Sequence, residues 1–276
     1  MNRIDLHVHT TASDGTCTPR ELILRAAAQG LSAVAITDHD TVLGLAEAMD
    51  AGLDTGVEVV PGIEVGTRHG VSIHILGYYL ENLIPLLADV VNERDRRNRE
   101  IAALMAADGL PVRYEAMRAR FGPSIGRPHF GRILVELGLA ESVADAFARY
   151  VGKGCRYYVP RRTIPLADTV EAIVQSGGVP VLAHPFQYRM DDAQLRALLR
   201  LCMDHGLRGM ECRYSGYGPE QTAYLERLAE EYGLLKTGGS DFHGDNKPHI
   251  ALGAGIAGEL DVPAEWLLAL REAATK

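Results

Sequence analysis

The residues best suited to chemistry in this chain of 276 residues are histidines that stand close to carboxylates. Six of the ten histidines lie at or just beyond the ends of expected strands. These histidines are His7, His9, His39, His74, His184 and His243, and the acids near them are Asp14, Asp38, Asp40, Glu64 and Asp241. Imidazole and carboxylate are the ligands that zinc, manganese and iron take in proteins. We expect Asp38 and Asp40 to orient imidazoles, or in the case of Asp40 to cap a helix, rather than to bind metal.

The spacing of two pairs supports a metal site. His7 and His9 are two positions apart, as are Asp241 and His243, and side chains two apart on a strand project from one face. A lone histidine is more often an ordinary hydrogen-bonded residue than a ligand. So many polar groups in one buried crevice would be costly, however, unless ions neutralised them. The number of candidate ligands indicates two or three ions that share a bridging carboxylate.

Short β-branched runs alternate with helical patterns, which is typical of β/α units around a mainly parallel sheet. The expected strands are 4–9, 32–37, 57–61, 71–76, 179–183, 209–213 and 234–237. The expected helices are 18–30, 41–51, 165–176, 191–205, 219–232 and a terminal helix from about 263. Seven strands in this alternation fit an α/β barrel, in which catalytic groups gather at the C-terminal ends of the strands.

The alternation stops between residues 80 and 164, where a long helical pattern at 82–107 precedes two or three shorter ones. This predicts a helical insertion at 80–164 that caps the substrate site, between barrel parts at 1–79 and 165–276. Residues 92–162 carry 14 Arg or Lys and 8 Asp or Glu, a balance of +6, although the whole chain has a formal charge of −8. Such a difference between segments indicates more about partners than the total does.

Composition excludes several classes of protein. The chain is 47% hydrophobic and 23% charged, as in ordinary globular proteins and unlike disordered ones. A net charge of −8 argues against a broad nucleic-acid surface. No apolar run is long enough to span a membrane, the N-terminus does not resemble a signal peptide, and the four cysteines lack CxxC spacing. We therefore expect a cytoplasmic protein with no membrane association and no obligate protein partner.

An ordered series of six motifs resembles the polymerase and histidinol phosphatase (PHP) family of the amidohydrolase superfamily. In chain order the motifs are His-x-His at 7–9, Thr-Asp-His-Asp at 37–40, Gly-Ile-Glu at 62–64, His-x-Leu-Gly at 74–77, Ala-His-Pro at 183–185 and Gly-Ser-Asp-x-His at 239–243. The resemblance implies an α/β fold, a distorted seven-stranded β/α barrel of the PHP type with a helical insertion domain. It also implies two or three divalent metal ions, of which Mn²⁺ is favoured over Zn²⁺ or Fe²⁺.

The same resemblance assigns ligands to three ions. It implies a first ion held by His7, His9, Glu64 and Asp241, a second that Glu64 bridges to His74 and His184, and a third held by Asp14, His39 and His243. The family often has histidine where this chain has Asp14, which leaves the third site with fewer imidazoles. We expect Glu64, Asp241 and His243 to act as catalytic residues of this cluster.

The insertion carries further motifs at 123–130, 150–154 and 158–161, which resemble the insert of one PHP subgroup. Members of that subgroup remove the 3′-phosphate of nucleoside 3′,5′-bisphosphates or trim short RNA from its 5′ end. Because Arg and Lys bind phosphate by charge-assisted hydrogen bonds, four insert residues are expected to hold a phosphate remote from the bond that is cut. They are Arg127, His129, Lys153 and Arg161. By contrast, Arg94, Arg96, Arg97 and Arg99 alternate with acids and predict a solvated helix face.

The sequence thus predicts a metal-dependent phosphatase that hydrolyses the 3′-phosphate of nucleoside 3′,5′-bisphosphates, for example adenosine 3′,5′-bisphosphate to AMP. A hydroxide that bridges two ions is the expected nucleophile. A 5′→3′ exonuclease on short 5′-phosphorylated oligonucleotides is the first alternative. A phosphatase of the histidinol phosphate type is less favoured, because a substrate with one phosphate leaves the basic insert without a role. A non-catalytic metal-binding module is the alternative from another class.

Overall fold

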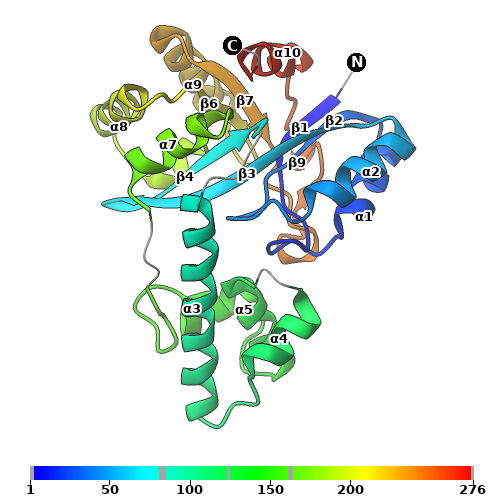
Figure 1. Ribbon diagram of the computed structural model, residues 1–276, viewed down its shortest axis with the longest axis vertical. Coiled ribbons are helices and arrows are strands. Elements are labelled where there is room, and N and C mark those ends of the chain that lie inside the picture. The colour runs from blue at the N-terminus through cyan, green and yellow to red at the C-terminus, as the bar shows by residue number, and fades with distance from the viewer. Residues whose placement is uncertain (1–2, 81–84, 123–124, 161–163, 275–276) are drawn as a thin grey trace.

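The structure is a computed structural model that describes residues 3–80, 85–122, 125–160 and 164–274. Figure 1 shows an α/β part and a helical part, which the long helix α3 joins. Within the described residues, no helix combines the length and the apolar character that crossing a membrane requires.

The α/β part is built on one seven-stranded sheet in the order β1 to β7. The strands are β1 (Arg3–Val8), β2 (Leu31–Ile36), β3 (Glu58–His69), β4 (Val71–Tyr78), β5 (Val179–Leu182), β6 (Gly209–Tyr214) and β7 (Leu235–Gly239). Neighbouring strands are parallel, except that β4 is antiparallel to both β3 and β5. Val8 forms a bridge with Phe242, just after β7, so the sheet nearly closes on itself. This confirms the distorted seven-stranded barrel.

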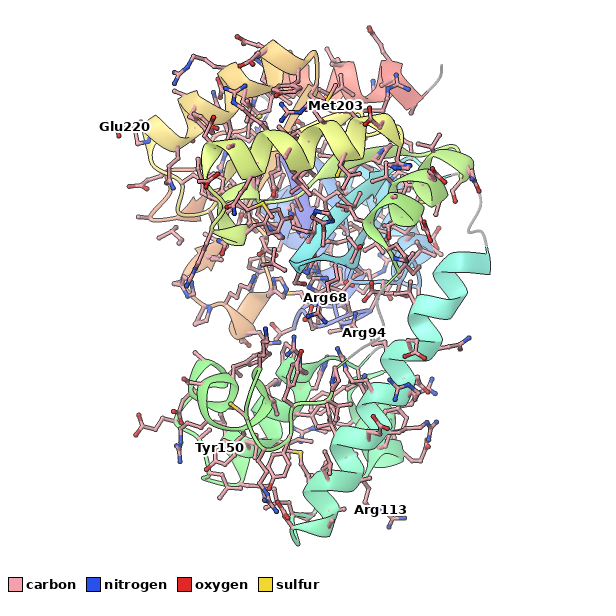
Figure 2. All side chains as sticks on the ribbon, turned by 90° about the vertical axis from the view of Figure 1, so that its left-hand side faces the viewer. Arg68, Arg94, Arg113, Tyr150, Met203 and Glu220 are labelled. Atoms are coloured by element: carbon pink, nitrogen blue, oxygen red, sulfur yellow. The ribbon has the colours of Figure 1, made fainter. Side chains whose placement is uncertain are left out.

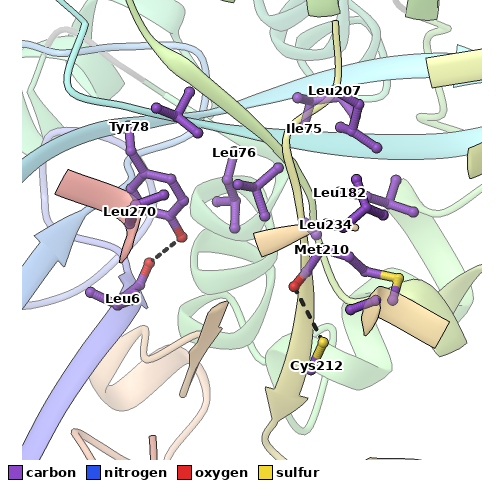
Figure 3. Packing of buried hydrophobic residues seen from close by; sticks show 14 of the residues in the cluster. Leu6, Ile75, Leu76, Tyr78, Leu182, Leu207, Met210, Cys212, Leu234 and Leu270 are labelled. Atoms are coloured by element: carbon purple, nitrogen blue, oxygen red, sulfur yellow. Dashed lines mark hydrogen bonds between the residues drawn. The ribbon is translucent and has the colours of Figure 1, made fainter. Parts of the chain in front are cut away.

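Helices lie against the outside of this sheet (Figure 1). They are α1 (Pro19–Ala28), α2 (Leu45–Thr55), α7 (Leu166–Gln175), α8 (Asp192–Asp204), α9 (Pro219–Tyr232) and α10 (Ala264–Ala274). The short elements are η2 (Pro185–Tyr188), η3 (Gly244–Asn246), β8 (Ile250–Ala251) and β9 (Gly255–Ile256). A local signal sets the start of α1, because Thr18 caps this helix in a capping box with Glu21. In the apolar core between strands and helices, the Tyr78 hydroxyl donates to the Leu6 carbonyl at 2.7 Å (Figure 3).

Two elements differ from the sequence-based expectation. Strand β3 continues through residue 69 and forms a hairpin with β4, whereas the expected strand ended at 61. The turn between them is Gly70, whose φ of 70° suits a residue without a Cβ. Helix α2 begins at Leu45 rather than at 41, and Gly44 is its N-cap residue.

The helical part consists of α3 (Pro85–Ala107), α4 (Tyr114–Phe121), α5 (Arg127–Glu136), α6 (Val143–Ala146) and the π-helical turn η1 (Phe147–Val151). It has an apolar core of its own, which includes Ile101, Phe130 and Leu134. Figure 2 shows this part below the barrel, with a gap between them that side chains enter from both sides.

Closure of the barrel depends on a close approach at the end of β7. A Cβ built on Gly239 would lie 2.4 Å from both the Cβ and the backbone nitrogen of His7. We expect Gly239→Ala to lower the free energy of unfolding by about 3 kcal/mol, measured by urea denaturation, because backbone on β1 must move. Gly218→Ala is the control, since its Cβ would meet only Gln221 Oε1 at 4.0 Å. Equal losses in the two variants would contradict this account of closure.

Candidate metal centre and substrate pocket

The expected metal ligands meet at one end of the barrel. His7 lies in β1, whereas His9, His39, His184 and Asp241 follow the ends of β1, β2, β5 and β7. Glu64 and His74 lie inside strands rather than at their ends. Because β4 runs antiparallel to β3, its first half lies at the end of the barrel where the parallel strands finish. The hairpin therefore brings both residues to the other ligands.

Glu64 is the centre of this cluster, and its side chain is 1% exposed. Its two carboxylate oxygens face five imidazole rings. Oε1 lies 2.7 Å from His74 Nδ1 and 3.0 Å from His184 Nε2, and Oε2 lies 2.9 Å from His39 Nδ1, 3.2 Å from His9 Nε2 and 3.4 Å from His7 Nε2. A carboxylate in this position can share its oxygens between two ions, as a bridging ligand does.

Three groups of side chains have ligand atoms within 4.8 Å of one another. They are His9, Asp14, His39 and His243; His7, His9 and Asp241; and His39, Glu64 and His74. His184 joins the last group through Glu64. All nine expected ligands thus lie in one cluster, although His9 and His39 each belong to two groups rather than to one.

Orphaned atoms show that the cluster suits metal ions. Seven buried side-chain nitrogens or oxygens among the described residues lack a hydrogen-bond partner, and five belong to His7, His9, Glu64 and His184. Unpaired buried polar atoms are costly, and divalent ions would use the same lone pairs. His184 and Asp241 also have positive φ angles of 27° and 55°. Such strained backbone is typical of functional sites.

A second layer of side chains holds the ligands, and sequence reasoning missed it. Glu211 on β6 is fully buried; its Oε1 lies 3.1 Å from His7 Nδ1, and its Oε2 accepts from the His184 backbone at 2.7 Å. Tyr214 and Lys247 donate to Asp241 Oδ2 at 2.6 and 2.5 Å. The available signal for Glu211 was an acid between two apolar residues, Met210 and Cys212, inside an expected strand. A buried acid costs free energy unless it has partners.

The acids beside His39 do not act as expected. Asp38 accepts hydrogen bonds from the backbone and hydroxyl of Thr10, at 2.8 and 2.6 Å, and from the hydroxyl of Ser13 at 2.5 Å. It therefore holds the loop after β1 rather than an imidazole. Asp40 caps no helix, because its carboxylate accepts from the Gly66 backbone and from a guanidinium.

Charges within the cluster set its protonation. Burial would raise the pKa of Asp241, but Lys247 and His243 hold that pKa well below its usual range. Burial, reinforced by His9 and Lys247, lowers the pKa of His243 to about 4. At neutral pH, Asp241 is therefore a carboxylate and His243 a neutral imidazole, the forms that bind metal.

The cluster opens into a cavity of about 560 Å³ between the barrel and the helical part. Its lining includes the cluster residues His39, His74 and His243. Six cationic side chains line it against two acids, Asp14 and Asp40. The cations are Arg68, Arg94, Arg97, Arg127, Lys153 and Lys247. The positive lining is suited to an anionic ligand although the chain as a whole is acidic.

The expected phosphate-binding residues are in different places. Arg127 and Lys153 line the cavity, and the Arg127 guanidinium lies over the rings of Phe147 and Tyr158, 5.5 and 5.7 Å from their centroids. His129 lines a neighbouring cavity instead. It is 2% exposed, its Nδ1 accepts from the Gly126 backbone at 2.9 Å, and burial lowers its pKa to about 4. Arg161 lies outside the described residues.

The predicted solvated face of α3 is wrong for two of its four arginines. Arg94 and Arg97 are only 6% and 8% exposed and line the cavity, whereas Arg96 and Arg99 are exposed as expected. Arg94 crosses to the barrel (Figure 2). It donates to the carbonyls of Ile125 and His39 at 2.9 and 2.8 Å. It also forms an ion pair with the buried carboxylate of Asp40 at 3.0 Å.

Comparison with known proteins shows the family to which the chain belongs. The sequence profile of the PHP domain matches residues 5–157. The 5′-3′ exoribonuclease Rnm of Escherichia coli K12 is 35% identical over 274 residues, 96% of this chain and 92% of that protein. The 3′,5′-nucleoside bisphosphate phosphatase of Chromobacterium violaceum is 35% identical over 250 residues, 88% of both proteins.

A solved structure shows the same fold. The crystal structure of a protein described as a candidate metal-dependent phosphoesterase from Bifidobacterium adolescentis superposes with a TM-score of 0.86 at 33% identity, covering 99% of this chain and 96% of that one. The chain belongs to the PHP domain family and is a metal-dependent phosphoesterase. This enzyme class excludes the non-catalytic module.

Proposed function

We propose that this phosphoesterase removes the 3′-phosphate of nucleoside 3′,5′-bisphosphates. One observation carries the proposal: the metal-ligand cluster and the insert residues Arg127 and Lys153 line the same cavity of about 560 Å³. A substrate with two phosphates can place one at the cluster and the other against the insert. The bisphosphate phosphatase of Chromobacterium violaceum, similar over most of its length, supports this substrate class.

The insert residues would bind the 5′-phosphate. Two aromatic rings confine the Arg127 guanidinium, so little side-chain freedom is lost when it forms paired hydrogen bonds to phosphate. Lys153 follows Gly152, where a Cβ would lie 2.3 Å from the Phe147 carbonyl oxygen. This glycine permits the tight turn after η1 that places the lysine in the cavity lining.

The cluster residues would hold the 3′-phosphate end. Bound divalent ions, for which we propose Mn²⁺, would neutralise the phosphoryl oxygens and lower the pKa of a bound water. Glu64, Asp241 and His243 are the ligands proposed to act in catalysis. Tyr214 and Lys247 keep the Asp241 carboxylate in one orientation, which leaves its other oxygen facing His7 and His9.

Phosphate release by the manganese-loaded enzyme tests the substrate. We expect kcat/KM for adenosine 3′,5′-bisphosphate to exceed that for AMP or histidinol phosphate by about 100-fold, because only the bisphosphate can place one phosphate at the cluster and the other at the insert. Lys153→Gln should raise KM for the bisphosphate about tenfold. Arg113→Gln, an exposed arginine far from the cavity, is the control. Equal rates on AMP and the bisphosphate would exclude a remote phosphate site.

A 5′→3′ exonuclease acting on short oligonucleotides is the second candidate. Exonuclease hydrolysis would break a P–O3′ bond, as removal of the 3′-phosphate from a bisphosphate does. The insert site proposed for the bisphosphate could hold the 5′-phosphate of the oligonucleotide. The observation in its favour is that the cavity continues past the cluster to the tip of the β3–β4 hairpin, where Arg68, Gly70 and Ser72 line it. The exoribonuclease of Escherichia coli is as similar to this chain as the bisphosphate phosphatase.

A further inference from the structure

The β3–β4 hairpin carries two metal ligands and two further polar residues on one face. Its register pairs Gly66 with His74 and Arg68 with Ser72. Because alternate residues of a strand share a face, Arg68 and Ser72 project on the same side as Glu64 and His74. They lie one strand repeat, about 7 Å, beyond the level of His74.

Arg68 is an available cation in the cavity lining. Its side chain is exposed, and its guanidinium forms no hydrogen bond or ion pair with the residues that the structure describes. Its backbone is fixed, since its amide donates to Thr67 Oγ1 at 2.6 Å and it forms a β-bridge with Pro165. The hydroxyl of Ser72, also in the lining, has no hydrogen-bond partner within the described part of the chain.

The other cations nearby are already engaged. Arg94 is paired with Asp40, and Lys247 with Asp241. On the barrel side, Arg68 is therefore the cation in the lining that can take a new anion without losing an existing partner.

We propose that Arg68 and Ser72 form a subsite for the phosphodiester that follows the scissile phosphate in an oligonucleotide. This rests on the proposed function, which places the 5′-phosphate at Arg127 and the scissile phosphate at the cluster. A step of about 7 Å along the hairpin is comparable with the separation of successive phosphates in an extended nucleotide chain. A nucleoside bisphosphate has no phosphate at this point.

The chemistry is the same for both kinds of substrate. The oxygen of water bonds to phosphorus, the P–O3′ bond breaks, and the departing 3′-oxygen takes a proton. From a bisphosphate the products are a nucleoside 5′-monophosphate and phosphate. From an oligonucleotide they are a nucleoside 5′-monophosphate and a strand shorter by one nucleotide, which keeps the phosphoryl group as its new 5′-phosphate. The subsite holds that strand and takes no part in bond breaking.

Three substrates that differ by single groups test the subsite: a nucleoside 3′,5′-bisphosphate, a 5′-phosphorylated dinucleotide, and the same dinucleotide with a 3′-phosphate. Only the last reaches Arg68. Release of the 5′-mononucleotide is measured by chromatography on the manganese-loaded enzyme. We expect Arg68→Gln to lower kcat/KM for the 3′-phosphorylated dinucleotide about tenfold, and to change the other two by less than about twofold. Ser72→Ala should act in the same direction, and Arg113→Gln should change none of them.

Other outcomes overturn the subsite. An equal loss of kcat/KM on all three substrates would mean that Arg68 acts through the stability of the fold or through the general electrostatic field of the cavity. An unchanged melting temperature would then exclude an effect on the fold. No loss on any substrate, or no hydrolysis of either dinucleotide by the unaltered enzyme, would also overturn it. If the bisphosphate is not hydrolysed but Arg68→Gln still lowers kcat/KM selectively for the 3′-phosphorylated dinucleotide, the proposed function fails while the subsite stands.

Discussion

Glu64→Gln is expected to lower kcat/KM on any phosphate ester by on the order of a thousandfold and to reduce the number of divalent ions bound per chain. A neutral amide has one oxygen acceptor and cannot neutralise two cations, whereas the carboxylate faces five imidazoles. Metal stoichiometry after dialysis gives a readout that does not depend on the substrate. The expected result is loss of at least one equivalent relative to the unaltered enzyme.

The matched control for this variant is Glu58→Gln. It makes the same change at the start of the same strand, where the half-buried Glu58 pairs with Arg271 instead of with imidazoles. Its activity and metal content should equal those of the unaltered enzyme. A fully active Glu64→Gln variant with unchanged metal content would show that the centre lies elsewhere.

Arg94→Met is expected to lower the free energy of unfolding by about 3–5 kcal/mol, because it removes a buried guanidinium from a buried carboxylate. The side chains of Arg94 and Asp40 are only 7% and 4% exposed. The same arginine donates to the carbonyl of the metal ligand His39, so kcat should fall as well. Urea denaturation and steady-state kinetics of the metal-loaded enzyme measure the two effects.

Two comparisons separate the role of Arg94 from a general loss of charge. Arg96→Met removes an exposed arginine two positions away, whose partners are Glu93 and Glu100, and should leave the free energy of unfolding nearly unchanged. Arg94→Lys keeps the charge but loses the planar fork that reaches two segments at once, so only part of the stability should return. Similar losses for Arg94→Met and Arg96→Met would refute the proposed link between α3 and the barrel.

Much of the fold could be predicted because its signals are local. Helix α9 has the expected bounds, 219–232, because Pro219 starts it and Gly233, in the left-handed conformation, ends it. The capping box at Thr18 sets the start of α1 in the same way. Nothing equally local marks the direction of a strand. The antiparallel course of β4 became visible only in its pairing with β3 and β5.

The sequence indicated which residues gather in the cluster, but not which residues hold them in place. Glu211 has no histidine beside it in sequence, and it reaches His7 across 204 positions of the chain. Arg94 has the same acidic neighbours as the exposed arginines of its helix, and its partner lies 54 positions away. Such contacts depend on which segments the fold brings together, so neither spacing nor charge pattern along the chain indicates them.

The sequence by itself determined the chemical groups of this protein: an acidic barrel with nine candidate metal ligands, and a basic helical insertion. Tertiary structure decided which groups face the cavity. It placed Arg68, Arg94 and Lys247 in the lining, and it buried His129 beside a neighbouring cavity. The physical reason is that the ligand chemistry of a side chain belongs to the residue itself, and helix boundaries depend on residues nearby in sequence. Burial and ion pairing depend instead on the approach of segments far apart in the chain.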